Sequence, residues 1–261
     1  MPLFTDQTGR TVSIHAAPQR IISLVPSQTE LLFHLGLEEE VIGITKFCIH
    51  PESWFHTKTR IGGTKQINTN IIEQLQPDLI IANKEENVKE QVEELEKQYP
   101  VWVSDVNNLE DALEMIKQIG LLTGTKEKAQ EINHRIRTNF DSLERSIPIL
   151  RTVYLIWRNP YMTVGGDTFI HAMLQQAGLE NIYGESSRYP SITIEQLKDD
   201  KPDLLLLSSE PYPFRQTHID ELQAHLPSTK IILVDGELFS WYGSRLLHSP
   251  AYFMNLRQQL K

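Results

Sequence analysis

The stretch from Ile21 to Leu37, IISLVPSQTELLFHLGL, places a serine between an apolar run and an amphipathic one. A serine at such a junction can be a nucleophile, a ligand contact or a helix cap. A nucleophile is not indicated, because the G-x-S-x-G elbow is absent from the sequence. Ser27 and Glu30 instead have the spacing of a capping box. We therefore expect Ser27 to cap a helix, and secondarily to contact a ligand at the carboxyl edge of a sheet.

Residue types that bind metals are present but widely spaced. Cys48, His50 and His56 share one predicted loop, and His218 and His225 flank a helical stretch, without the tight spacing of a zinc site. A single cysteine excludes an internal disulfide. The stretches IGGTKQ and VGGD match neither a dinucleotide-binding nor a phosphate-binding loop. The sequence predicts no metal site and no intrinsic cofactor, and leaves open whether Cys48 or His50 touches a metal.

Aromatic side chains follow several of the apolar runs. Phe47 comes after the run VIGIT, Trp157 ends a second run, Tyr189 lies in a loop, and Trp241 belongs to the stretch DGELFSWYGSR. Aromatic walls with a few polar groups are typical of sites for large, flat ligands, although such residues can also cover the core. The polar side chains that could orient a ligand there are Arg158, Asp235 and Arg245.

The elements that must position these residues alternate along the chain. The apolar runs predicted as strands are 20–25, 41–45, 79–82, 101–104, 152–157, 204–207 and 231–234. Amphipathic segments, such as 29–35, 71–75, 88–98 and 168–177, lie between them. Continuous apolar runs are typical of parallel strands covered on both faces. The alternation therefore indicates an α/β fold.

The two halves of the sequence are similar to each other. HLGLEEEVIG at 34–43 is echoed by QAGLENIYG at 176–184, and QPDLIIA at 76–82 is echoed by KPDLLLL at 201–207. The echoes occur in the same order, which favours two similar α/β lobes. We expect an N-terminal lobe over 1–108 and a C-terminal lobe over 149–261.

A helical bridge is predicted between the lobes, over 109–148. Gly124 interrupts it, Thr125 can cap a second helix, and Pro148 can end that helix. A helix between these limits has roughly 22 residues and a length of about 33 Å. We expect it to act as a stiff connection, since a flexible linker would be rich in Gly and Ser.

Composition restricts the class of partner. The chain has 261 residues and a formal net charge of -9, which argues against nucleic acid as a partner because phosphate binding needs a basic surface. No apolar run reaches the roughly 20 residues of a membrane span. The first twenty residues lack the apolar stretch of a secretory signal. This leaves a cytoplasmic location or a chain whose leader has been removed.

A family resemblance joins these observations. The segments PQRIISLVPSQTELLFHLGL, VIGIT, HPES, IGGT, IIEQLQPDLIIA and IEQLKDDKPDLLLL occur in an order that resembles class III substrate-binding proteins of ABC importers for vitamin B12, haem and iron-siderophores. The resemblance extends from about Asp6 to the C-terminus. It implies two Rossmann-like α/β lobes with parallel sheets, bridged by one long rigid helix, with the ligand in the cleft between the lobes. It also implies a non-catalytic, monomeric protein of the periplasm or another extracytoplasmic compartment.

The same resemblance implies a set of ligand contacts. Carried over one position at a time from the B12 receptors, the aromatic contacts fall at Phe47, Lys65, Asn83, Trp157 and Tyr189. Three of these positions keep an aromatic residue and two do not, so the ligand is left open between a corrinoid, haem and a ferric siderophore. The resemblance also implies contacts at Asp235 and Arg245, while the sequence pattern alone indicates Ser27, Arg158 and Trp241. The cationic side chains of Lys65, Arg158 and Arg245 would suit an anionic iron chelate or a haem propionate.

The resemblance finally implies docking to an ABC transporter permease through one glutamate in each lobe. Seven residues before Pro202 stands Glu195, whereas seven residues before Pro77 stands Asn70, with Glu73 as the nearest acid. Paired acidic residues would favour a basic permease rim. The unmatched position keeps an alternative open, a cytoplasmic ligand-binding chaperone or enzyme of cofactor handling on the same scaffold. Its acid or base candidates are Glu30, His50 and Asp235.

Overall fold

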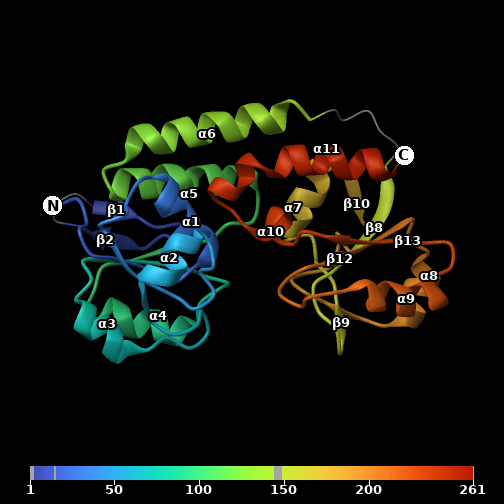
Figure 1. Ribbon diagram of the computed structural model, residues 1–261, viewed down its shortest axis with the longest axis horizontal. Coiled ribbons are helices and arrows are strands. Elements are labelled where there is room, and N and C mark those ends of the chain that lie inside the picture. The colour runs from blue at the N-terminus through green and yellow to red at the C-terminus, as the bar shows by residue number, and fades with distance from the viewer. Residues whose placement is uncertain (1–2, 15, 144–148, 261) are drawn as a thin grey trace. The chain divides into compact units, whose positions relative to one another are not determined.

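The computed structural model describes residues 3–14, 16–143 and 149–260 (Figure 1). The chain forms two compact units. Unit 1 comprises Met1–Val106, Glu110–Ile136 and Tyr242–Arg245. Unit 2 comprises Asn107–Leu109, Arg137–Trp241 and Leu246–Lys261. Unit 1 therefore contains a short segment from the C-terminal part of the sequence.

Unit 1 is built on a five-stranded parallel sheet with the strand order β5-β4-β3-β6-β7. Its strands are β3 (Ile21–Ser23), β4 (Val41–Ile44), β5 (Thr59–Arg60), β6 (Leu79–Asn83) and β7 (Val101–Ser104). Every position of β3, β6 and β7 is buried, as expected for continuous apolar runs. An antiparallel pair, β1 (Leu3–Thr5) with β2 (Thr11–Ser13), precedes the sheet.

Helices connect these parallel strands. They are α1 (Pro26–His34), α2 (Glu52–Thr57), α3 (Thr69–Leu75) and α4 (Lys89–Glu96), followed by α5 (Leu109–Leu122) and α6 (Lys126–Asp141). The first part of α6 belongs to unit 1 and its last residues to unit 2. Crossing a membrane takes about 20 apolar residues in one helix, and none of the helices in the described parts of the chain has that length and apolar character.

Unit 2 is built on a four-stranded parallel sheet with the order β10-β8-β12-β13. Its strands are β8 (Leu150–Leu155), β10 (Leu179–Asn181), β12 (Leu204–Ser208) and β13 (Lys230–Val234). A separate antiparallel pair joins β9 (Tyr161–Met162) to β11 (Ser191–Ile192). The helices are α7 (Phe169–Gln176), α8 (Ile194–Asp200), α9 (Gln216–His225), α10 (Glu237–Ser240) and α11 (Ser249–Leu260), with the 3₁₀ helix η1 (Ser244–Leu247).

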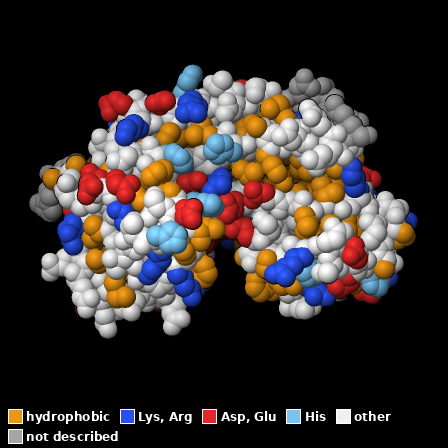
Figure 2. Space-filling view, in the orientation of Figure 1, with side chains coloured by type: hydrophobic (Ala, Val, Ile, Leu, Met, Phe, Trp, Pro, Cys, Tyr) orange, Lys and Arg blue, Asp and Glu red, His pale blue; other side chains and the backbone are white. Residues whose placement is uncertain are grey.

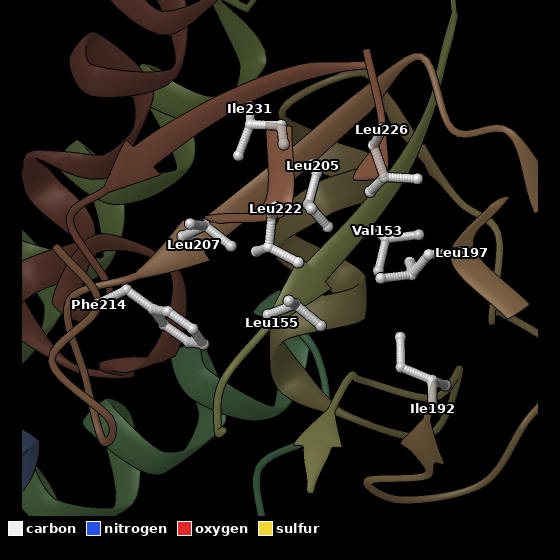
Figure 3. Close-up of a cluster of buried hydrophobic side chains, with 10 residues drawn as sticks. All are labelled: Val153, Leu155, Ile192, Leu197, Leu205, Leu207, Phe214, Leu222, Leu226 and Ile231. Carbon is white, nitrogen blue, oxygen red and sulfur yellow. The ribbon is translucent and has the colours of Figure 1, made fainter. Parts of the chain in front are cut away.

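One face of the unit 2 sheet is covered by α8 and α9. Figure 3 shows Val153 and Leu155 of β8 with Leu205 and Leu207 of β12 in one cluster. The other members of this cluster are Ile192, Leu197, Phe214, Leu222, Leu226 and Ile231. Because Leu222 is fully buried in the cluster, α9 is held firmly against the sheet.

The repeated Pro-Asp dipeptide has the same structural role in both units. Asp78 accepts hydrogen bonds from the backbone N–H groups of Gln19 and Arg20, at 2.8 and 2.9 Å. Asp203 accepts one from the N–H of Arg151, at 2.8 Å. In each unit the aspartate thus accepts hydrogen bonds from backbone N–H groups at the start of the neighbouring strand, β3 or β8. The predicted internal similarity is therefore present in the hydrogen bonding as well as in the sequence.

The helices before these dipeptides also match. Both α3 and α8 end at a residue in the left-handed conformation, Gln76 with φ 45° and Lys201 with φ 47°. Both begin after a capping side chain, that of Asn68 or Thr193. Consequently Asn70 and Glu195 occupy the same place, the second residue of the helix, and both are exposed.

Two predictions about helix ends are wrong. Ser27 does not cap α1: Pro26 is the first helical residue, the N-cap is Val25, and within the described chain no side chain caps this helix. Proline is favoured at the first position because its missing N–H has no partner there. The long helix α6 ends at Asp141 with 16 residues, so it is shorter than the predicted 22. Positions 144–148 lie outside the described residues.

Candidate ligand-binding site

In unit 1, the carboxyl ends of the parallel strands carry a buried polar network. The Asn83 side chain donates to the carbonyl and hydroxyl of Ser104 at 3.2 and 2.9 Å, and accepts from the N–H groups of Glu85 and Glu86 at 2.8 and 3.0 Å. Asn83 is only 2% exposed. Since its donors and acceptors are used inside the protein, this candidate contact shapes the loop after β6.

Two other candidates in unit 1 face solvent. Phe47, three residues after β4, is 52% exposed, and the Lys46 ammonium lies 5.1 Å from the centroid of its ring. Lys65 is exposed and donates to the carbonyl of Glu85 at 2.5 Å. Burial raises the pKa of the nearby Glu86 carboxyl, and the charge of Lys65 opposes that shift. This edge therefore offers an exposed ring and cations.

Arg245 is engaged by a carboxylate of the same unit. Its Nη2 lies 2.8 Å from Glu30 Oε1, and its Nε donates to Glu30 Oε2 at 3.0 Å. The neighbouring Ser244 hydroxyl lies 2.8 Å from His34 Nδ1. Ser27, which lies on α1 together with Glu30 and His34, is 4% exposed. These contacts attach Tyr242–Arg245 to α1, so Arg245 and Glu30 have a structural role here.

Cys48 and His50 give little basis for a metal site. Cys48 is fully buried, its sulfur lies 3.1 and 3.2 Å from the hydroxyls of Thr29 and Thr45, and burial raises the pKa of its thiol. Across residues 3–14, 16–143 and 149–260, no three His, Cys, Asp or Glu side chains are grouped so that they could hold a metal ion.

In unit 2, Trp157 follows β8 and is 41% exposed. Its ring and that of Tyr212 are arranged edge to face, with centroids 5.7 Å apart and planes at 71°. The adjacent Arg158 donates from Nη2 to both carboxylate oxygens of Glu221, at 2.9 and 2.7 Å. Hydrogen bonds with Tyr161, Glu221 and Tyr212 raise the pKa of the Arg158 guanidinium. The ion pair of Arg158 with Glu221 therefore links the residue after Trp157 to α9.

The remaining candidates differ in exposure. Tyr189 is half-buried, with the Arg188 guanidinium 5.4 Å from its ring centroid. Asp235 is exposed after β13, and its carboxylate accepts from the N–H of Glu237 at 3.1 Å. Trp241 is 7% exposed and donates to Glu210 at 2.9 Å, so it covers the core.

Sequence reasoning missed Tyr212, His218 and Glu221 as a group. Tyr212 stands in the stretch EPYPF after the apolar run 204–207, so the pattern that selected Trp157 could have selected it. The pairing of Arg158 with Glu221 spans 63 residues and left no signal in the sequence.

Charged side chains show no single dominant sign on the visible face. In Figure 2, Lys and Arg side chains are dispersed among Asp and Glu side chains rather than gathered into one extended basic area. The chain as a whole carries a formal net charge of -9.

Comparison with known proteins places this architecture in a class. The model of the periplasmic binding protein family matches residues 21–229. A vitamin B12-binding protein of Vibrio vulnificus (strain CMCP6) is 29% identical over 204 residues, which cover 76% of this chain and 74% of that protein. The chain, with one parallel sheet in each of its units, thus belongs with solute-binding proteins, which are not enzymes.

Solved structures share the fold at low identity. A periplasmic haem-binding protein of Roseiflexus sp. RS-1 superposes with a TM-score of 0.81 at 19% identity, covering 93% of this chain and 99% of that one. A protein of an ABC-type Fe3+-hydroxamate transport system from Saccharomonospora viridis DSM 43017 gives 0.76 at 18% identity, with coverages of 97% and 98%.

The chain belongs to the periplasmic binding protein family and is of the class III type. The predicted α/β fold is confirmed. Members of this family work outside the cytoplasm, bind small metal chelates and serve ABC transporters. Their metal-bearing compound is the cargo, and they carry no catalytic cofactor.

Proposed function

We propose that this protein is the monomeric, periplasmic or otherwise extracytoplasmic, substrate-binding component of an ABC importer for a metal-containing chelate. The observation that carries the proposal is the exposure of aromatic rings after parallel strands, Phe47 at 52% and Trp157 at 41%. Trp54, Trp102 and Trp241 are at most 7% exposed. Aromatic rings left exposed after strand ends can form the walls of a site for a large, flat ligand, which needs such walls together with a few polar groups.

A corrinoid is the first candidate ligand. The sequence relatives are vitamin B12-binding proteins, whereas the haem and hydroxamate proteins share only the fold. The proposed ligand contacts are Phe47 and Lys65 in unit 1 and Trp157 and Tyr189 in unit 2. Asp235 remains a candidate because it is exposed.

Five earlier candidates are weaker as direct contacts. They are buried, or their polar groups are engaged within their own unit: Ser27, Asn83, Arg158, Trp241 and Arg245.

The ligand class can be tested by tryptophan fluorescence. Purified protein is titrated with cyanocobalamin, haemin and a ferric hydroxamate, and its own visible spectrum is recorded before any addition. Saturable quenching by one compound at micromolar concentration or below supports the receptor and identifies its ligand class. A folded protein that responds to none of the three contradicts the proposal.

Permease docking is proposed to involve Glu195. It is exposed in the first turn of α8, where a negative charge is favoured by the helix dipole. The matching position in α3 is Asn70, so the acidic group of unit 1 would be Glu73, which is also exposed. Replacing Glu195 by alanine should slow ligand uptake by cells while leaving ligand affinity unchanged. Normal uptake would remove the docking role.

A further inference from the structure

The exposed ring of Trp157 is carried by a short hairpin whose two sides bind the same carboxylate. Ile156 donates its N–H to the carbonyl of Met162 at 3.0 Å, and Met162 donates back to Trp157 at 3.1 Å. Arg158 follows one side of this hairpin, and Tyr161 lies on the other. Both side chains donate to Glu221 of α9, Arg158 at 2.7 Å and Tyr161 at 3.3 Å. Glu221 therefore fixes the hairpin from both sides.

A second residue of α9 fixes the neighbouring ring. The hydroxyl of Tyr212 lies 3.2 Å from Nε2 of His218. The N–H of Arg215 donates to Nδ1 of the same imidazole at 2.8 Å, so Nδ1 is an acceptor and Nε2 carries the proton donated to Tyr212. The backbone N–H of Tyr212 also donates to the carbonyl of Ile156, at 3.3 Å. Tyr212 is thus held from two directions.

His218 and Glu221 are three residues apart and so lie on the same side of α9. The helix itself cannot easily shift, since Leu222 is fully buried in the core cluster of Figure 3. Figure 1 shows β9 and α9 at the same end of unit 2. The helix therefore acts as a fixed support for the rings of Trp157 and Tyr212.

We propose that His218 and Glu221 are positioning residues that hold Trp157 and Tyr212 as a two-ring aromatic wall, and that Tyr212 is a further ligand contact. Two rings in a fixed edge-to-face arrangement present a rigid surface to a flat ligand, so little conformational freedom is lost on binding. This inference rests on the proposed function for its binding role. The positioning role can be measured without any ligand.

The ligand-free measurement uses the exposure of the tryptophans. Among the four in the sequence, Trp157 is exposed and the other three are buried, so quenching by acrylamide and fast anisotropy decay report mainly on Trp157. Glu221→Ala removes the carboxylate at an exposed helical position where alanine is a good helix former. The matched control is Asp220→Ala, because Asp220 is exposed on the same helix and its carboxylate accepts a hydrogen bond from the side chain of Gln216, on α9 itself.

We expect Glu221→Ala to give a faster and larger anisotropy decay of Trp157, with a melting temperature equal to that of Asp220→Ala. The dissociation constant for cyanocobalamin should rise roughly two- to five-fold, and an exposed ion pair supports no larger change. Tyr212→Leu should raise the dissociation constant roughly ten-fold. Tyr212→Phe keeps the ring but loses the hydroxyl that contacts His218 and Arg158, so its dissociation constant should lie between those of Tyr212→Leu and the wild type.

Unchanged anisotropy in Glu221→Ala would overturn the positioning role, whatever the ligand. If the wild type binds cyanocobalamin and Tyr212→Leu binds it with the same dissociation constant, Tyr212 is not a ligand contact. If the wild type binds none of the three test compounds, the proposed function fails together with the contact role of Tyr212. The anisotropy comparison still decides the positioning role in that case.

Discussion

Glu30 and Arg245 are 215 residues apart in the sequence and form a two-contact ion pair within unit 1, at 2.8 and 3.0 Å. Their side chains are 11% and 16% exposed, so both charges are largely removed from water. The pair attaches the segment Tyr242–Arg245 to α1. The ion pair gives Arg245 a partner within its own unit, 215 residues away in the chain, which the sequence could not show.

Replacing Arg245 by alanine should lower the free energy of unfolding by about 2–4 kcal/mol, because it leaves the Glu30 carboxylate poorly compensated. Ligand affinity should be unchanged in protein that remains folded. Chemical denaturation measures the first effect and fluorescence titration the second. A double-mutant cycle with Glu30→Ala should show strong coupling. A large loss of affinity at full stability would instead make Arg245 a ligand contact.

Replacing Trp157 by alanine should weaken ligand binding by about 1–3 kcal/mol, the usual range for an aromatic anchor. Stability should change little, since the ring is already 41% exposed. Leu233 is a suitable control because it is equally exposed, at 41%, and belongs to the same unit. Its replacement by alanine should leave affinity unchanged. Calorimetric titration of both variants compares them directly.

The pair of Arg158 and Glu221 should give the mobility of Trp157 a pH dependence. The guanidinium lowers the pKa of Glu221, whose other charged or titratable neighbours are Tyr161 and His218. A lowered carboxyl pKa means that the contact is fully present above the ordinary glutamate value, about 4.3, and is lost as the pH falls through the lower folded value. Acrylamide quenching should therefore increase below about pH 4.3 in the wild type. The Glu221→Ala variant should lack this step.

Ser27→Ala should change the free energy of unfolding by less than about 0.5 kcal/mol, because Ser27 lies inside α1 and alanine is the better helix former. Thr193→Ala provides the contrast. Thr193 accepts from the N–H of Gln196 at 3.2 Å in a complete capping box, so its loss should cost about 1 kcal/mol. Thermal unfolding of the two variants tests the assignment. Equal losses would restore Ser27 as a cap.

Much of the fold could be predicted because parallel strands buried on both faces leave continuous apolar runs. The run 204–207 and the strand β12 (Leu204–Ser208) nearly coincide, and so do the run 101–104 and β7. The Pro-Asp dipeptides predicted equivalent turns, and Asp78 and Asp203 have matching hydrogen bonds. Short strands such as β9 and β11 could not be predicted, because a strand of two residues is too short to show an apolar run or an alternation of apolar and polar residues.

The candidate site was less predictable for a physical reason. Sequence pattern indicates which residues follow a strand, but exposure depends on partners that are distant in the chain. Trp157 and Trp241 have the same residue type and similar settings, yet the first is exposed and the second is buried with Glu210. The predicted cap at Ser27 failed because Pro26 can begin a helix without a capping side chain.

The receptor role of Trp157 is tested by a fluorescence titration of wild type and Trp157→Ala with cyanocobalamin, haemin and a ferric hydroxamate under the same conditions. We expect one compound to quench the wild type saturably and to bind the variant at least several-fold more weakly. Equal affinity of wild type and variant would remove Trp157 from the binding surface. No binding of any compound by folded wild-type protein would contradict its proposed role as a receptor for a metal chelate.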